Sequence, residues 1–167
     1  MTGLDRRSTA RLPGLLSLTL LTALLGCGAS GSHGDEPATA LPFLEIAGTR
    51  VDLELARSPE EQIQGLSDRP ELDWGRGLLF QYSTPRRQRF WMRRMRFSID
   101  IVWIRERRIV EIHQRLPIPE EGTLDSELMT YSSGEPVDAV LEVPAGFSEA
   151  HGWRRGQLVK LSPDAAL

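Results

Sequence analysis

The chain has 167 residues, of which 40% are hydrophobic and 26% charged, and its formal net charge is −3. This length favours a single domain, and this composition excludes an intrinsically disordered protein or one made mainly of membrane-spanning helices. Fifteen glycines and eleven prolines indicate many turns, as in a domain of short strands. The one cysteine, Cys27, excludes an intramolecular disulfide.

Residues 1–26 have the pattern of a signal peptide. Arg6, Arg7 and Arg11 precede an uncharged, mostly apolar run over 12–26. At about 1.5 Å per residue this run falls short of the roughly 30 Å hydrocarbon core of a bilayer. The pattern therefore predicts a cleaved signal peptide and not a spanning helix.

Cys27 follows Leu24-Leu25-Gly26 and resembles the cysteine of the bacterial lipobox, which becomes the lipid-bearing first residue of the mature protein. An ordinary secretory peptide with an incidental cysteine is the alternative. The resemblance implies a membrane anchor of two or more acyl chains, such as palmitate, because one chain binds only marginally. It places the protein in the cell envelope, facing the periplasm or exterior, and Gly28 would favour the outer membrane in a two-membrane host. Residues 27–42 are small and polar and predict a flexible tether after the lipidated cysteine.

The first elements expected after the tether are two strands and a short helix. The strands lie within 43–56 on either side of a turn at 47–49, and the second alternates apolar with acidic residues, as a half-buried strand does. A helix is predicted after Ser58, its N-cap, with Pro59 at the first position and Glu61 completing a capping box. Gly65 is expected to end this helix.

Further strands and a short helical segment complete the predicted domain. The strands are expected at 77–82, 98–104, 108–116, 137–146 and 156–162, and the helical turns at 147–153. The strand at 98–104 is apolar on both faces and is expected to be central; in the strand at 137–146, Ala139, Leu141 and Val143 are expected to face inward. About seven short strands and one or two short helices predict a mainly β domain (α+β at the margin), barrel-like or a sandwich, over 43–162, with a tail at 163–167.

Three segments resemble the domain-of-unknown-function family 192, an uncharacterised prokaryotic family. They are SPEEQIQGLSDRPELDWGRGLLFQY (58–82), FWMRRMRFSIDIVWIRERRIVEI (90–112) and VLEVPAGFSEAHGWRRGQLV (140–159). The resemblance extends over 43–161, and its most specific part places Trp91, Met92, Ile99, Asp100 and Ile101 at the family's spacing. It implies a compact, mostly β fold, often exported, and implies no catalytic activity.

The chain departs from the family pattern at several positions. Arg93-Arg94-Met95 stands where members usually have Lys-Asn-Thr, and Ser98 replaces a common proline. The loop at 117–131 lacks the cysteine of several relatives, and Gln157 replaces an aspartate near the C-terminus. A function that depends on those family residues is therefore not carried over to this chain.

An arginine-rich stretch, RRQRFWMRRMR, is the most unusual part of the sequence. Ten arginines and only three acidic residues lie between 86 and 115, whereas 116–138 holds six acidic residues and no base. Arginine binds carboxylate and phosphate groups and stacks on aromatic rings, so Phe90 and Trp91 within this cluster could form an aromatic-floored site for a small anionic or sugar-like ligand. Alternatively, the arginines pair internally with the acidic segment while Trp91 and Met92 pack into the core.

Asp100 interrupts an apolar run, where a carboxylate is unfavourable unless it is paired. Arg93, Arg94 or backbone N–H groups could satisfy it inside the protein. In the alternative role, Asp100 faces a ligand. The candidate ligand-binding residues are therefore Trp91, Met92, Arg93, Arg94 and Asp100.

Other kinds of chemistry find little support in the sequence. The three histidines lie far apart and form no ligand-spaced pair, so no metal site and no cofactor is expected. No serine stands in a Gly-x-Ser-x-Gly motif, and nucleic-acid binding is not expected outside the cytoplasm. These patterns favour a lipid-anchored, non-catalytic module that binds a small ligand or an envelope protein. The alternatives are an envelope glycan hydrolase that uses Asp100 with nearby arginines, and an accessory protein whose arginines serve only internal pairing.

Overall fold

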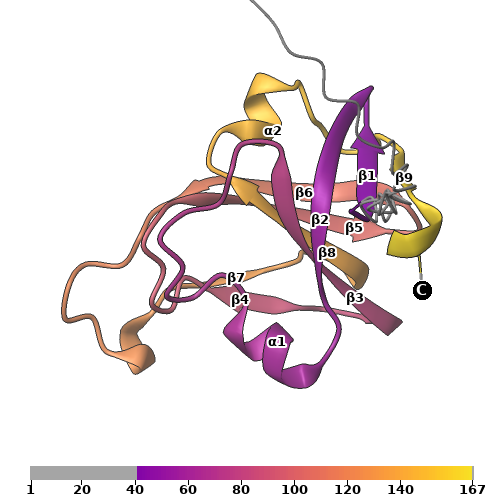
Figure 1. The fold of residues 1–167 in the computed structure, drawn as a ribbon. Helices are drawn as coiled ribbons and strands as arrows, with labels where there is room; N and C mark the ends of the chain where they lie inside the picture. Colours follow the sequence, from indigo (N-terminus) through magenta and orange to yellow (C-terminus); the bar gives the residue numbers. More distant parts are fainter. Residues whose placement is uncertain (1–40, 167) are drawn as a thin grey trace, which may run out of the picture. The chain divides into compact units, whose positions relative to one another are not determined.

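Seven strands form one curved sheet in residues 41–166, the part of the chain that the computed structural model describes (Figure 1). They are β1 (Phe43–Ile46), β2 (Thr49–Ala56), β3 (Arg76–Arg86), β5 (Ile99–Arg105), β6 (Arg108–Leu116), β8 (Val137–Pro144) and β9 (Val159–Leu161). The order across the sheet is β6-β5-β8-β3-β2-β1-β9. Neighbours are antiparallel except β2 and β3, which are parallel and connected through α1 (Pro59–Gln64).

The two edge strands of this sheet approach each other at one end. Arg108 at the start of β6 pairs with Leu158, just before β9, and the Val159 N–H donates to the Arg107 carbonyl at 2.8 Å. The sheet therefore curls into a barrel that closes at this end. The expectation of a mainly β, barrel-like domain is confirmed.

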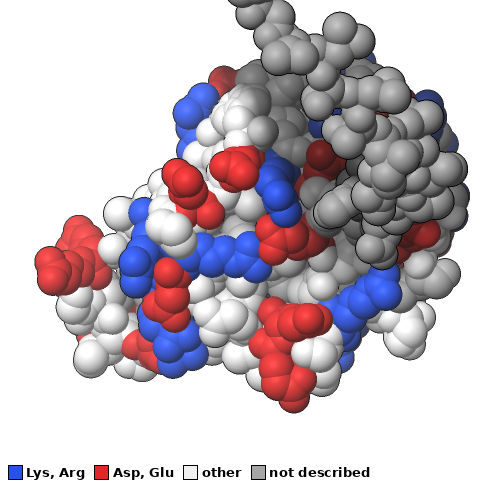
Figure 2. Space-filling view, in the orientation of Figure 1, with Lys and Arg blue, Asp and Glu red and all other residues white. Residues whose placement is uncertain are grey.

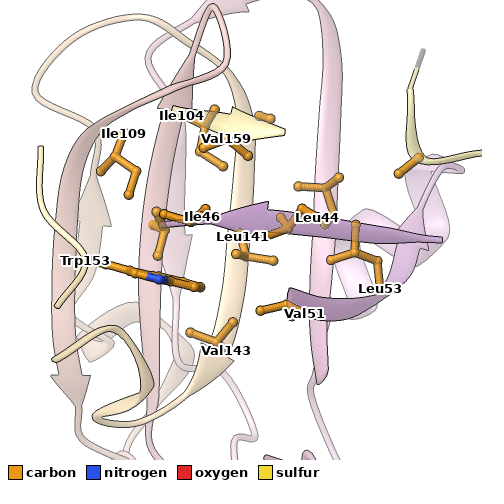
Figure 3. Close-up of a cluster of buried hydrophobic side chains, with 14 of the residues drawn as sticks. Leu44, Ile46, Val51, Leu53, Ile104, Ile109, Leu141, Val143, Trp153 and Val159 are labelled. Atoms are coloured by element: carbon orange, nitrogen blue, oxygen red, sulfur yellow. The ribbon is translucent and has the colours of Figure 1, made fainter. Parts of the chain in front are cut away.

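The barrel interior holds the larger of two apolar clusters. Figure 3 shows Leu44 and Ile46 of β1 directed toward Leu141 of β8 and toward Trp153, which follows α2. Ala139, Leu141 and Val143 all belong to this interior cluster, as expected for the inward face of β8. Burial of this cluster contributes roughly 25 cal/mol for each Å² of apolar surface removed from water.

A second apolar cluster covers the outer face of the central strands. It contains Phe80 of β3, Ile101 and Trp103 of β5, and Val140 of β8. Six of the seven residues of β5 are buried. The strand is covered on both faces, as its apolar pattern predicts, but it lies second from the edge of the sheet, between β6 and β8, and not at its centre.

Helix α1 has the ends that the sequence predicts. The Ser58 side chain accepts a hydrogen bond from the Glu61 N–H at 3.1 Å, and Glu61 Oε2 accepts from the Ser58 N–H at 2.8 Å. Pro59 occupies the first position, and Gly65 ends the helix with φ of 50°. These hydrogen bonds lower the pKa of the Glu61 carboxyl.

A two-stranded ribbon, absent from the sequence prediction, lies on the outer face of the barrel. It pairs β4 (Arg89–Trp91) with β7 (Thr130–Ser132). Phe90 packs edge-to-face on Phe80 at 4.9 Å and on Trp103 at 5.5 Å between ring centroids. The ribbon thus covers apolar surface that the sheet alone would leave exposed.

Two element ends also differ from expectation. Strand β3 continues to Arg86, past the Ser83–Pro85 segment at which it was expected to stop. Its register with β8 shifts between Gln81 and Arg86, and this irregularity accommodates the proline. Residues Pro163–Ala165, assigned to a tail, form the short helix η2 and bury Ala165 in the barrel interior.

Residues 1–40 and 167 lie outside the described part of the chain, and with them the predicted signal peptide, the lipid attachment at Cys27 and nearly all of the tether. Within residues 41–166, no helix combines the length and apolar character needed to cross a membrane. The Pro42 carbonyl accepts a hydrogen bond from the Leu53 N–H at 2.7 Å, so ordered pairing begins one residue before the expected start of the domain.

A chain shortened to begin at Leu41 is expected to melt within about 2 °C of the full mature chain. It keeps the Pro42–Leu53 hydrogen bond and loses only the segment without a packing pattern. Differential scanning calorimetry of both chains checks this. A large loss of melting temperature on shortening would show that the tether packs on the domain.

Candidate functional site

A cavity of about 210 Å³ lies on the outer face of the barrel, beside the ribbon. The C-terminal half of α1 and the segment that follows it form one wall, β4 forms another, and β3 and β8 form the base. Figure 1 shows α1 and β4 at the end of the domain opposite α2 (Phe147–Ala150). The residues that line the cavity include Ile63, Gly65, Phe80, Tyr82, Gln88, Arg89, Phe90, Trp91 and Glu142.

Glu142 of β8 is the one carboxylate among the residues lining this cavity, and it is only 5% exposed. Its Oε2 atom has no hydrogen-bond partner among the described residues. Burial raises the pKa of Glu142 to about 8, against a smaller lowering by the charge of Arg69. The side chain is therefore a neutral carboxylic acid at pH 7, able both to donate and to accept a hydrogen bond.

Gln88, just before β4, is the second buried polar residue of the cavity. Its backbone is fixed to the β7 side of the ribbon, since its N–H donates to Ser133 Oγ at 3.2 Å and its carbonyl accepts from the Ser133 N–H at 3.2 Å. Its side-chain Nε2 has no partner in the described part of the chain. Buried polar atoms are seldom left unpaired in proteins, so two of them at one cavity indicate a binding site.

Aromatic side chains form much of the cavity and its rim. Phe80 and Phe90 are in edge-to-face contact, and Trp91 is 51% exposed although its neighbours in the chain pack inward. Ile63, on the facing wall, is 70% exposed. Burial also raises the pKa of Tyr82 to about 12, which keeps its phenol neutral and able to donate. An apolar rim over a polar base is typical of small-molecule sites.

Arg93 and Arg94, candidate ligand-binding residues in the sequence, connect the two walls of the cavity. The Arg93 carbonyl accepts from Ser67 Oγ at 2.8 Å, and the Arg94 carbonyl accepts from the Asp68 N–H at 2.9 Å. The Arg94 side chain pairs with Asp68 at 3.1 Å, while Arg93 Nε lies 2.8 Å from Asp125 Oδ2 at an angle outside hydrogen-bond geometry. Both arginines therefore fix the loops that surround the site.

Asp100 lies in the protein interior with no exposed surface and does not line the cavity. Its Oδ1 accepts from the backbone N–H groups of Arg115 (2.8 Å) and Gly146 (2.9 Å). Its Oδ2 accepts from the N–H (3.0 Å) and the hydroxyl (2.6 Å) of Ser148. Of the two roles left open by the sequence, these contacts fit the structural one, with backbone groups as partners. The hydrolase alternative, which depends on Asp100, gains nothing from this geometry.

The five candidate residues do not converge on one site. Trp91 alone lines the cavity, and Met92 is 3% exposed and packs in the outer apolar cluster. Internal pairing of arginines with the acidic 116–138 segment is seen for Arg93 with Asp125. On the face shown in Figure 2, basic and acidic side chains are interleaved and do not form one basic patch.

Glu142 and Gln88 were not identified from the sequence. Glu142 alternates with the inward-facing Leu141 and Val143, so it reads as a residue on the solvent side of a half-buried strand. The one sequence feature that indicates a covered outer side is Val140, an apolar residue on the same side of the strand as Glu142. The structure also shows no group of three or more potential metal-ligating side chains within residues 41–166.

Comparison with known proteins identifies the class to which this fold and site belong. The model of the DUF192 family, described as "Uncharacterized ACR", matches residues 43–161. The chain therefore belongs to domain-of-unknown-function family 192, as its sequence motifs imply. No curated protein matches the chain.

Two solved structures share the fold. One, from Sinorhizobium meliloti 1021, is described as a "putative transcription regulator"; it is 25% identical, with a TM-score of 0.64 over 72% of this chain and 92% of that one. The other is a protein of unknown function from Novosphingobium aromaticivorans DSM 12444, 27% identical, with a TM-score of 0.63 over 74% of this chain and 89% of that one. Both support the mainly β fold.

Proposed function

We propose that this protein is a lipid-anchored envelope protein whose domain binds a small sugar-like ligand in the cavity beside Trp91, without catalysing a reaction on it. The observation that carries the proposal is the pair of buried, unpaired polar side chains, Glu142 and Gln88, facing a cavity with an exposed tryptophan. Sugars combine hydroxyl groups with apolar ring faces. They would hydrogen-bond to such a base and stack on such a rim.

The size and charge of the cavity support this choice of ligand. At about 210 Å³ it is smaller than the roughly 300–1,000 Å³ of most small-molecule sites, so it suits one ring or side group of a larger molecule. Its base carries a carboxyl group and no arginine, which disfavours the small anion considered as an alternative. It offers one carboxylate, so it lacks the pair that most glycoside hydrolases use.

The anchor at Cys27 forms part of the same proposal and rests on the lipobox-like sequence. A domain tethered outside the cytoplasm would meet envelope glycans at high local concentration. The description of the Sinorhizobium protein suggests a different activity, the regulation of transcription. Binding of nucleic acid would require a basic surface, and the face shown in Figure 2 carries interleaved charges and not one basic patch.

Trp91→Ala is expected to weaken sugar binding by about 10- to 100-fold, the effect of removing one stacked aromatic anchor. Isothermal titration of the domain beginning at Leu41 with a panel of monosaccharides measures this. The matched control is Trp74→Ala, because Trp74 is also exposed, at 60%, but packs on Phe147 and does not line the cavity. Equal loss in both variants, or no binding by the unaltered domain, would contradict the proposed site.

Cys27→Ser is expected to abolish lipid attachment, since a serine hydroxyl cannot replace the thiol that carries the first acyl chain. Cells grown with a labelled fatty acid and fractionated into membrane and soluble parts provide the measurement. Incorporation of label into the Cys27→Ser protein would show that this cysteine is not the anchor.

A further inference from the structure

We infer that Glu142 and Gln88 are the specificity-determining residues of this cavity, and that they select an uncharged ligand group bearing both a hydrogen-bond donor and an acceptor, a hydroxyl or an amide. This inference rests on the proposed function, because it names the chemistry that the same cavity recognises. The observations behind it are the two buried atoms without hydrogen-bond partners, Gln88 Nε2 and Glu142 Oε2, and the groups that surround them.

The two unpaired atoms have complementary requirements. Gln88 Nε2 is a donor and needs an acceptor, whereas the Glu142 carboxyl, when protonated, offers one donor and one acceptor. Hydroxyl and amide groups can accept from Gln88 and can exchange either kind of hydrogen bond with Glu142, so such groups match the requirements of both residues. A cation could pair with an ionised Glu142, but it would place further N–H donors against Gln88 Nε2.

The charged and titratable groups around Glu142 agree with a neutral ligand. Arg69 acts on Glu142 from the loop after α1, Tyr82 lies beside it on β3, and Arg89 lines the cavity from β4 with its side chain exposed. These arginines do not satisfy the buried Oε2 atom, and they would oppose entry of a cation. An anionic group offers acceptors only, so it could accept from Gln88 Nε2 but would leave an acceptor oxygen of Glu142 without a donor.

The packing at the base leaves little freedom for the Glu142 side chain. A methyl group placed on Gly65 would lie 3.6 Å from the Phe80 ring and 4.0 Å from Glu142 Oε2, so the loop after α1 closes directly over both residues. Phe80 is held in turn by its edge-to-face contact with Phe90. The carboxyl is therefore a fixed recognition group and not a mobile surface charge.

Four matched monosaccharides separate the possible ligand chemistries. D-glucose and N-acetyl-D-glucosamine are neutral, D-glucosamine is a cation at about pH 6, and D-glucuronate is an anion. Isothermal titration of each into the Leu41–Leu167 domain is expected to show binding of a neutral sugar and at least tenfold weaker binding of the two charged ones. The affinity for the neutral sugar is expected to fall by up to about tenfold per pH unit above pH 8, as Glu142 loses its proton.

Two variants distinguish recognition by Glu142 from a role in folding. Glu142→Gln keeps an uncharged group with a donor and an acceptor but cannot ionise, so its affinity for the neutral sugar should no longer fall above pH 8. Glu142→Leu keeps similar volume without polar atoms and should bind about 10- to 100-fold more weakly while remaining folded by circular dichroism.

The possible results distinguish a failure of this inference from a failure of the proposed function. Tighter binding of glucosamine or glucuronate than of the neutral sugars, or undiminished binding by a folded Glu142→Leu domain, would overturn this inference and leave the proposed sugar-binding function standing. No binding of any of the four sugars by the folded, unaltered domain at any pH would overturn the proposed function, and the inference with it.

Discussion

Asp100→Ala is expected to lower the free energy of unfolding by about 3–5 kcal/mol, the range seen when half of a buried, charged interaction is removed. The carboxylate is completely buried and accepts four hydrogen bonds, three of them from backbone N–H groups. Alanine would leave these donors buried without partners. Each unpaired buried donor costs about 1–3 kcal/mol.

The position of these donors explains why the fold depends on Asp100. They come from Arg115 near the end of β6, from Gly146 in the turn between β8 and α2, and from Ser148 in α2, and Asp100 thus holds these segments together. Arg115 has a left-handed backbone (φ 52°), which is strained for a residue other than glycine, whereas Gly146 (φ 81°) adopts one without strain. The turn favours glycine because of this positive φ, which other residues rarely adopt.

Urea unfolding followed by tryptophan fluorescence measures the Asp100→Ala effect. Asp125→Ala is the matched control, because its carboxylate is 60% exposed and forms a surface ion pair with Arg93, which is worth about 1 kcal/mol or less. Stability changes of equal size in the two variants would contradict the structural role of Asp100.

The stability of the protein is expected to fall as pH rises from about 4.5 to about 8. Burial raises the pKa of Glu142 from its ordinary value of 4.5 to about 8, so within this window the unfolded chain is ionised at this residue while the folded chain holds one more proton. The slope approaches about 1.4 kcal/mol per pH unit, and the total reaches several kcal/mol. Below the window both states are protonated and above it both are ionised, so the contribution of Glu142 is then constant.

Comparison with Glu142→Gln isolates this effect, because all other titrating groups are common to the two proteins. The difference in unfolding free energy between Glu142→Gln and the unaltered protein should grow from pH 5 to pH 8 and then become constant. Urea melts at closely spaced pH values provide the data. A difference independent of pH across this window would mean that Glu142 is ionised in the folded protein.

Local signals in the sequence were sufficient for most of the fold. The capping residues of α1 and the alternation in β2 depend on near neighbours, so they could be predicted before the structure was known. The ribbon of β4 and β7 could not, because each strand has three residues and the partners lie about forty positions apart in the chain. Its residues Arg89–Trp91 were instead interpreted as part of an arginine-rich surface.

The candidate site was predictable only in part, for a related reason. Trp91 was identified because an aromatic residue within an arginine cluster is unusual in any sequence. Glu142 was missed because alternation shows which side of a strand a residue faces and not what covers that side. The cover here comes from the loop after α1 and from β4, so the burial of Glu142 depends on tertiary packing. Asp100 was recognised as anomalous, and its backbone partners were among those considered.

The central claim, that the cavity lined by Glu142, Gln88 and Trp91 is a ligand site, is tested most directly by mapping where a sugar binds. In ¹⁵N-labelled domain titrated with N-acetyl-D-glucosamine, we predict that the amide shifts of Gly65, Gln88 and Trp91 change together and saturate. Amides at the far side of the barrel, such as Val159, should remain unchanged. Saturating shifts confined to other parts of the domain, or no saturating shifts at all, would contradict the claim.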